Sequence, residues 1–107
     1  MSAPAHHRAE PRSDHARAVL FVCDLLTAQG ATVIAANTDE AGEPQIFAQS
    51  DAGELAFYLV RTGLDEPSEA ALERFRALAG RHEVAAYFAP VALEPEPHCP
   101  GFRAIKR

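Results

Sequence analysis

The segment 54–61 constrains the fold of this chain most strongly, because it is apolar on both of its sides. Its residues are ELAFYLVR, and the side chains of a strand alternate between the two faces of a sheet. Both alternating sets are apolar or aromatic: Leu55, Phe57 and Leu59 on one face, and Ala56, Tyr58 and Val60 on the other. A strand buried on both faces belongs in the centre of a sheet that helices cover from both sides. The segment therefore indicates an α/β domain.

Two segments have the helical periodicity needed to cover such a sheet. In the first, Ser13 or Asp14 can cap the N-terminus, and Gly30 can end the helix in the left-handed conformation. Its apolar residues recur at one-turn spacing, and they are Val19, Val22, Cys23 and Leu26. The second helix opens with the acidic and capping residues of 65–68, and we expect Gly80 to end it. Its predicted buried stripe consists of Ala71, Leu72, Phe75, Leu78 and Ala79.

Short apolar runs predict the remaining strands. They are Thr32–Ala36, Gln45–Gln49 and Val84–Ala89, with Pro90 expected to end the last one and a short edge strand within 101–105. The resulting order is helix, three strands, helix, strand, and the second helix has the length of a crossover between parallel strands. We therefore predict a single αβββαβ sandwich with a central mixed sheet over residues 13–107. Residues 1–12 are expected to form a mobile tail, and 90–101 a proline-rich extended connection.

Composition excludes several classes of protein. A chain of 107 residues forms one domain. Ten basic against fifteen acidic residues give a net charge of −5, which disfavours a nucleic-acid binder that relies on bulk electrostatics. The sequence has no run of 18 apolar residues and no secretory leader, and its two cysteines, Cys23 and Cys99, have neither zinc-site nor disulfide-framework spacing. We expect a soluble cytoplasmic protein without a membrane span.

The predicted element order is also that of the restriction-endonuclease-like PD-(D/E)XK core, and the local sequence strengthens the match. Small endonuclease-like proteins related to Holliday-junction resolvases carry L-x-x-x-G in the first helix, then a strand and an Asn, G-E-I-D-L-I-A, a hairpin, and L-V-F-V-E-V-K-x-R. This chain resembles them in Leu26-x-x-x-Gly30, in TVIAAN at 32–37, in GEPQIFA at 42–48 and in LAFYLVR at 55–61. The resemblance covers residues 14–92 and implies the endonuclease-like fold.

The catalytic residues of that family do not carry over. The metal-binding Asp falls on Gln45, the second acid on Leu59 and the Lys on Arg61, and the Glu of the first helix falls near Val19. Such nucleases hold Mg²⁺ through carboxylate oxygens. Gln offers only a neutral oxygen, Leu offers none, and Arg stays protonated because its pKa lies above about 12. We therefore predict no catalytic residues, no metal and no cofactor, with Gln45, Leu59 and Arg61 as degenerate positions.

Acidic residues elsewhere leave one enzymatic alternative open. Five acids lie near the predicted hairpin: Asp39, Glu40, Glu43, Asp51 and Glu54. Glu43 precedes Gln45 by two residues, so it could face the same side of a strand. Pro44 lies between them, and the solvated turn of 39–43 favours a structural role over a rebuilt metal site.

The histidines and the basic residues favour structural roles. The adjacent pair His98 and Cys99 is too isolated in sequence to indicate a metal or nucleophile site, and His82 suits the C-terminal end of the second helix. His6, His7 and His15 complete no ligand pattern. The arginines of the second helix (Arg74, Arg76 and Arg81) alternate with glutamates, as on a solvated face with local ion pairs.

Three hypotheses follow. The leading one is a catalytically inactive nuclease-like domain that acts as a binding or interaction module, with a second copy of the chain or another protein as partner. Nucleic acid is a partner that the net charge does not favour. The alternative is a divergent metal-dependent DNA endonuclease with a rearranged acidic site near Glu43. The third is a small α/β domain unrelated to the nucleases.

Overall fold

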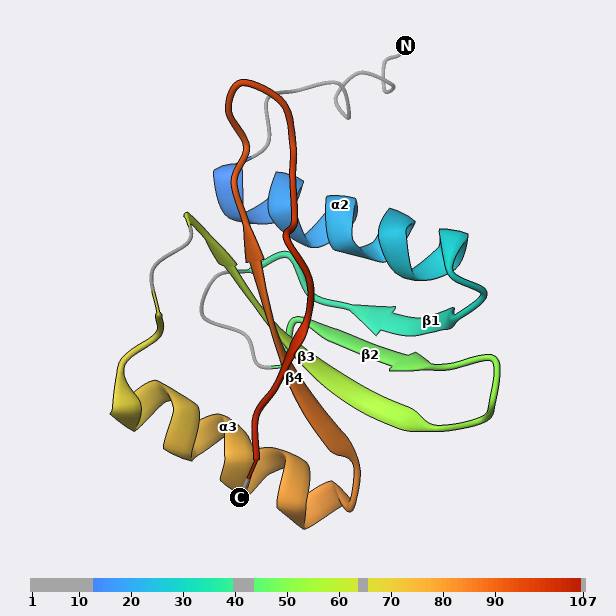
Figure 1. The fold of residues 1–107 in the computed structure, drawn as a ribbon. Helices are drawn as coiled ribbons and strands as arrows, with labels where there is room; N and C mark the ends of the chain where they lie inside the picture. Colours follow the sequence, from blue (N-terminus) through green and yellow to red (C-terminus); the bar gives the residue numbers. More distant parts are fainter. Residues whose placement is uncertain (1–12, 40–43, 64–65, 107) are drawn as a thin grey trace, which may run out of the picture.

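The structure is a computed structural model that describes residues 13–39, 44–63 and 66–106 (Figure 1). Its elements are α2 (Asp14–Ala28), β1 (Thr32–Ala36), β2 (Ile46–Gln49), β3 (Leu55–Thr62), α3 (Glu69–His82), β4 (Ala85–Val91) and β5 (Arg103–Ala104). The αβββαβ order is confirmed, with a two-residue strand added at the end. The expected tail 1–12 lies outside the described residues, as does Glu43.

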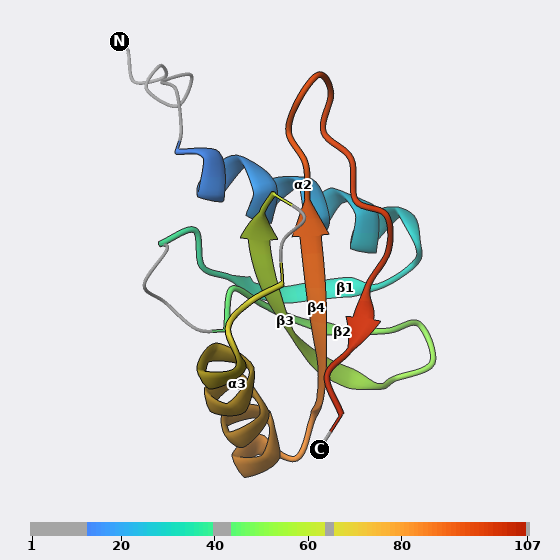
Figure 2. The same ribbon diagram turned by 60° about the vertical axis from the view of Figure 1, so that its left-hand side comes forward.

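One five-stranded mixed sheet forms the centre of the fold. The strand order is β1-β2-β3-β4-β5, with β3 and β4 parallel and the other neighbours antiparallel. Helix α2 covers one face of the sheet and α3 covers the other (Figure 2). The parallel pair is joined by α3, as the crossover prediction required.

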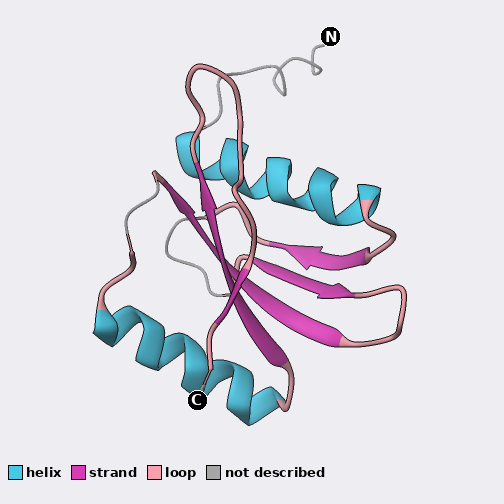
Figure 3. Ribbon diagram, viewed as in Figure 1, coloured by secondary structure: helices cyan, strands magenta, loops and turns pink. Residues whose placement is uncertain are grey.

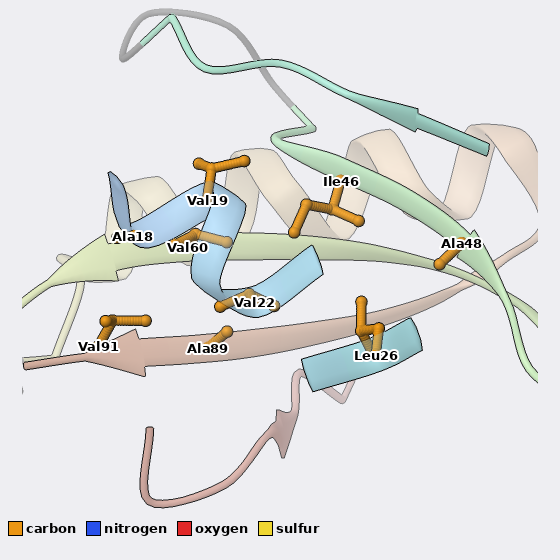
Figure 4. Packing of buried hydrophobic residues seen from close by; sticks show 9 residues of the cluster. All are labelled: Ala18, Val19, Val22, Leu26, Ile46, Ala48, Val60, Ala89 and Val91. Atoms are coloured by element: carbon orange, nitrogen blue, oxygen red, sulfur yellow. The ribbon is translucent and has the colours of Figure 1, made fainter. Parts of the chain in front are cut away.

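The strand β3 is central and its two faces enter two separate apolar clusters. Val60 packs with residues of α2 such as Val19 and Val22 (Figure 4). Phe57 and Leu59 pack on the other face, against α3. The alternation predicted for 54–61 is thus confirmed, and β3 separates the two cores.

Both helices begin at the predicted serine caps. The Ser13 hydroxyl accepts a hydrogen bond from the backbone N–H of Ala16 at 3.0 Å, and the Ser68 hydroxyl accepts one from Ala71 at 3.1 Å. Each bond satisfies an N–H of the first turn, which has no partner within the helix.

The C-terminal ends of the helices only partly match the prediction. Gly30 follows α2 with a φ of +93°, as expected. Gly80, however, does not end α3, which continues to His82. The left-handed position falls on Glu83, with a φ of +58°. The backbone N–H groups of Glu83 and Val84 donate to the carbonyls of Gly80 and Ala79. The hydrogen bonding of the helix therefore continues about one turn beyond the end of the apolar stripe.

Strand β4 also extends further than predicted, because it includes Pro90. Pro90 pairs with Arg61 of β3 in the register of the sheet, whereas β5 pairs only with Tyr87 and Phe88. A proline is tolerated where the neighbouring strand does not need its missing N–H. Smaller differences are that β2 starts one residue later than predicted and that β5 covers only part of 101–105.

The proline-rich segment after β4 forms a closed loop rather than a simple extended connection (Figure 3). Two backbone hydrogen bonds join Ala92 and His98, at 2.8 and 2.7 Å. Over the described ranges, no helix has the length and apolar character needed to cross a membrane.

Candidate functional site

Gln45, the residue just before β2, is a neighbour of the end of β3 that contains Leu59 and Val60. Ile46 of β2 pairs with Tyr58 of β3, so the antiparallel register sets Gln45 opposite Leu59. Both side chains are fully buried, with 0% exposure. The two positions that were compared in sequence with the metal-binding acids of the nucleases are therefore adjacent.

The polar atoms of Gln45 are used to hold the sheet together. Its side-chain oxygen Oε1 accepts a hydrogen bond from the backbone N–H of Val60 at 3.0 Å. Its backbone carbonyl accepts another from the N–H of Asn37 at 2.6 Å. Since β2 starts only at Ile46, the Gln45 side chain takes the place of a strand backbone and continues the pairing with β3.

The other positions that were compared with catalytic residues of the nucleases lie in apolar or hydrogen-bonded surroundings. Leu59 is enclosed by apolar side chains such as Phe75 and Phe88. Arg61 is half-buried, and its Nη1 donates to the carbonyl of Val60 at 3.1 Å. Val19 packs in the α2 cluster, on the face opposite Leu59. Val19 is therefore separated from Leu59 by the sheet, and the four positions do not all meet in one site.

The acids considered as substitutes are also dispersed. Asp51 and Glu54 line a cavity on the α2 face together with Tyr58, so the sheet separates them from Gln45 and Leu59. Asp39 is exposed, while Glu40 and Glu43 lie outside the described residues. Within the described ranges, no three His, Cys, Asp or Glu side chains come together as a group that could hold a metal ion.

An apolar hollow of about 490 Å³ lies beside Gln45 on the α3 face. It is lined by side chains from β1, β2, β3 and the end of α3, and they include Ala35, Pro44, Phe47, Leu55, Phe57, His82 and Val84. The Phe57 ring makes edge contacts with Phe47 at 5.3 Å and with His82 at 5.4 Å between ring centres. Instead of a polar metal site, this side of the sheet offers aromatic surface.

The sequence analysis missed this hollow, although a signal for it was present. Phe47, Leu55 and Phe57 share one face by alternation, and α3 lies over β3 and β4 and leaves the β1–β2 side of that face uncovered. Leu55, which lines the hollow, consequently remains 38% exposed, and Ile34 in the edge strand β1 is 49% exposed. His82, expected only at the helix end, contributes its ring to this surface.

The cysteines and the α3 arginines take structural positions. Cys23 and Cys99 pack at the border of the α2 cluster, and burial raises the pKa of both thiols, which disfavours the reactive thiolate. Arg76 forms ion pairs with Glu73 at 2.5 Å and with Glu69 at 3.7 Å. The ion pairing predicted for that helix face is therefore confirmed at Arg76.

Comparison with known proteins supports the fold and shows a family. A solved structure with the same fold is Hjc, a Holliday junction resolvase from the archaeal hyperthermophile Archaeoglobus fulgidus, with a TM-score of 0.63 and 19% sequence identity. The match covers 89% of this chain and 78% of the Hjc chain. No curated protein matches. Residues 15–98 match the family described as a domain of unknown function (DUF8840). The chain therefore belongs to the DUF8840 family and has the nuclease-like fold of a Holliday junction resolvase.

Proposed function

We propose that this protein is a catalytically inactive nuclease-like domain that acts as an interaction module. The observation that carries the proposal is the pairing of Gln45 with Val60. The side-chain oxygen at the position of the family's metal-binding acid is buried and bonded to a backbone N–H. An oxygen held in this way does not face an open coordination position, which Mg²⁺ chemistry requires.

The neighbouring positions support the same conclusion. Leu59 supplies no oxygen and is enclosed by aromatic rings. Arg61 presents a guanidinium that donates to the Val60 carbonyl, and a guanidinium does not replace lysine in proton-transfer chemistry. Restoring cleavage would therefore require Gln45→Asp, Leu59→Glu and Arg61→Lys together, and the apolar cluster would have to open around the new carboxyl.

The apolar hollow beside Gln45 is the surface that we propose for the interaction, and a second copy of this chain is the proposed partner. The hollow adjoins β1, which is an edge strand of the sheet. Edge strands of soluble proteins usually carry charges or prolines that prevent pairing. The sequence of β1, TVIAA, has neither. Two β1 edges can thus pair antiparallel across a two-fold axis without bringing like charges together, although each chain carries a net charge of −5.

The catalytic part of the proposal is tested with a labelled four-way DNA junction incubated with Mg²⁺ or Mn²⁺. We expect intact DNA on a denaturing gel, with the triple variant Gln45→Asp/Leu59→Glu/Arg61→Lys as a matched sample. Cleavage by the unmodified protein would overturn the proposal. Loss of that cleavage in Glu43→Ala would then support the divergent endonuclease. Anisotropy measured at two salt concentrations reports any binding of the junction without cleavage.

The interaction surface is tested by sedimentation of the full chain over a range of concentrations. We expect a dimer that Ile34→Lys and Leu55→Lys weaken. Leu20→Lys is the matched control, because Leu20 on α2 is 39% exposed against 38% for Leu55 but lies away from the hollow. A monomer at every concentration, or an equal effect of all three variants, would contradict the role of the hollow.

A further inference from the structure

A second cavity, of about 300 Å³, lies on the α2 face of the sheet, where the proposed interaction has no part. Its lining combines aromatic rings with acidic side chains. The residues that matter here are Leu26, Asp51, Glu54, Tyr58, Tyr87 and Phe102. Among the residues that the structure describes, this lining includes no Lys or Arg, so its two acidic side chains have no basic partner within the cavity.

Three aromatic rings meet at this cavity. Tyr58 and Tyr87 are register partners on the parallel strands β3 and β4. Their rings stack with centres 5.3 Å apart and planes 22° apart. Phe102 approaches Tyr58 edge-on, also with centres at 5.3 Å. The faces of such rings carry negative potential and attract cations, most strongly when the cation is shielded from water.

The carboxylates in the lining are available for a ligand. Within the described part of the chain, neither Asp51 nor Glu54 forms an ion pair. Both belong to the connection between β2 and β3, in which the Ser50 hydroxyl accepts hydrogen bonds from the N–H groups of Ala52 and Glu54. That connection fixes the backbone and leaves the charged groups free to face a cation.

The C-terminal end of α2 adds to the negative potential. Gln29, the residue that caps this end, lies in the cavity lining. The C-terminus of a helix carries a partial negative charge that Lys, Arg or His normally compensates. The last turn of α2 has no basic residue. The two carboxylates, the helix end and the aromatic faces therefore all favour a positively charged ligand in the cavity.

We propose that this cavity binds an organic cation whose charged nitrogen carries alkyl groups. Such a group suits a lining that mixes carboxylates, aromatic rings and apolar side chains such as Leu26, since its methyl groups contact the rings while its charge is balanced. The same alkylammonium chemistry can come from a free small molecule or from a methylated lysine of a partner.

The electrostatic surroundings of Tyr58 support the geometry. Burial, the neighbouring Tyr87 and the charge of Glu54 all raise the pKa of the Tyr58 phenol above its usual value. The field of the Glu54 carboxylate thus reaches the aromatic pair. A cation bound between Glu54 and the tyrosine rings would lower the pKa of Tyr58.

The composition of the chain provides a direct measurement of binding. The protein has two tyrosines and no tryptophan, so its intrinsic emission comes from Tyr58 and Tyr87 alone. We would titrate the full chain with choline at constant ionic strength and follow this emission. The matched control ligand is 3,3-dimethylbutan-1-ol, which has the shape of choline without its charge. We expect a saturable change with choline and none with the neutral alcohol.

Variants identify the cavity as the source of the signal. Glu54→Gln should weaken choline binding by up to about fivefold, as expected for one exposed carboxylate, and Asp51→Asn should add to this. Glu69→Gln removes a carboxylate from α3, on the other face, and should leave binding unchanged. The comparison of choline with its neutral isostere needs no variant, so it remains decisive if a variant folds poorly.

A last arm separates the two sources of the cation. An N-acetylated trimethyllysine amide is titrated beside choline, with the unmethylated lysine amide as its control. Tighter binding of the trimethyllysine ligand assigns the site to a partner protein, and tighter binding of choline assigns it to a free molecule. An equal response to choline and the neutral alcohol, or no saturable response to either cation, would overturn the proposal. The dimer measurement above does not depend on this result.

Discussion

The side-chain oxygen of Gln45 accepts a hydrogen bond from the backbone N–H of Val60 at 3.0 Å, one step beyond the last strand pair of β2 and β3. The bond is fully buried. Without it, the N–H of the central strand would have to find another partner in an apolar layer. The position that was compared in sequence with the metal-binding Asp of the nucleases thus holds a polar side chain that completes the sheet.

Replacing Gln45 should therefore destabilise the protein. Gln45→Met keeps most of the volume but leaves the Val60 N–H without its acceptor, and a buried donor left without a partner costs about 1–3 kcal/mol. The free energy of unfolding from urea titrations checks this. Gln29→Met, at an exposed residue, is the control and should be nearly neutral. A Gln45→Met protein as stable as the wild type would show that the bond contributes nothing.

The pKa of Tyr58 should fall when Glu54 loses its charge. Burial, Tyr87 and Glu54 raise this pKa, and Glu54→Gln removes the last of these causes. Absorbance at the phenolate band measures the change in a Tyr87→Phe background, where Tyr58 is the sole tyrosine. Glu69→Gln in the same background should not shift the curve. An unchanged pKa in Glu54→Gln would place the carboxylate too far from the ring to act on a ligand.

The ion pair between Glu66 and Arg103 should make stability depend on pH in the acid range. Arg103 binds both carboxylate oxygens, at 2.9 Å for the Nη2–Oε1 pair, and this hydrogen bonding lowers the pKa of Glu66. A lowered pKa in the folded state means that the pair stabilises the protein above pH 4.5, the usual value for the free side chain, and ceases to do so as the pH falls through the folded value.

Glu66→Gln should accordingly lose less stability than the wild type between pH 5 and pH 3, as measured by thermal unfolding at each pH. Glu96→Gln, at an exposed residue of the loop after β4, should follow the wild-type curve. Parallel curves for Glu66→Gln and the wild type would mean that the ion pair between Glu66 and Arg103 contributes no stability in solution.

The architecture could be predicted from the sequence because strong local patterns agree with each other. The two-sided apolar strand β3, the serine caps and the crossover length each point to the same sandwich. The ends of elements were less predictable. The end of α3, for example, depends on hydrogen bonds that the N–H groups of Glu83 and Val84 donate, and not on the apolar stripe. Pro90 is tolerated within β4 because β5 is too short to pair with it. No local sequence pattern encodes this tertiary arrangement.

The candidate sites were less accessible from the sequence than the fold. The family resemblance and the residue types predicted that Gln45 and Leu59 would lack metal-binding chemistry, but the hydrogen bond from the Val60 N–H to the Gln45 oxygen follows only from how β2 lies against β3. The cavity that we propose for an organic cation could not be predicted, for the same reason. Tyr58 and Tyr87 are 29 positions apart in the sequence, and only the parallel pairing of β3 with β4 stacks their rings.

The burial of Leu59 leads to the sharpest prediction about the proposed loss of the metal site. Leu59→Glu would place a carboxyl among Phe57, Phe75 and Phe88, where an ionised group has no partner. By analogy with uncompensated buried charges, the cost is about 3–5 kcal/mol at neutral pH. Burial favours the neutral form, so the folded-state pKa of the introduced carboxyl should rise above the unfolded value of about 4.3. The destabilisation should therefore be smaller at pH 4 than at pH 7.

Urea titrations of Leu59→Glu at both pH values, with the uncharged Leu59→Gln as control, test this. A Leu59→Glu protein that is no less stable at pH 7 than Leu59→Gln would mean that the position tolerates a carboxylate, and the case for a lost metal site would fail.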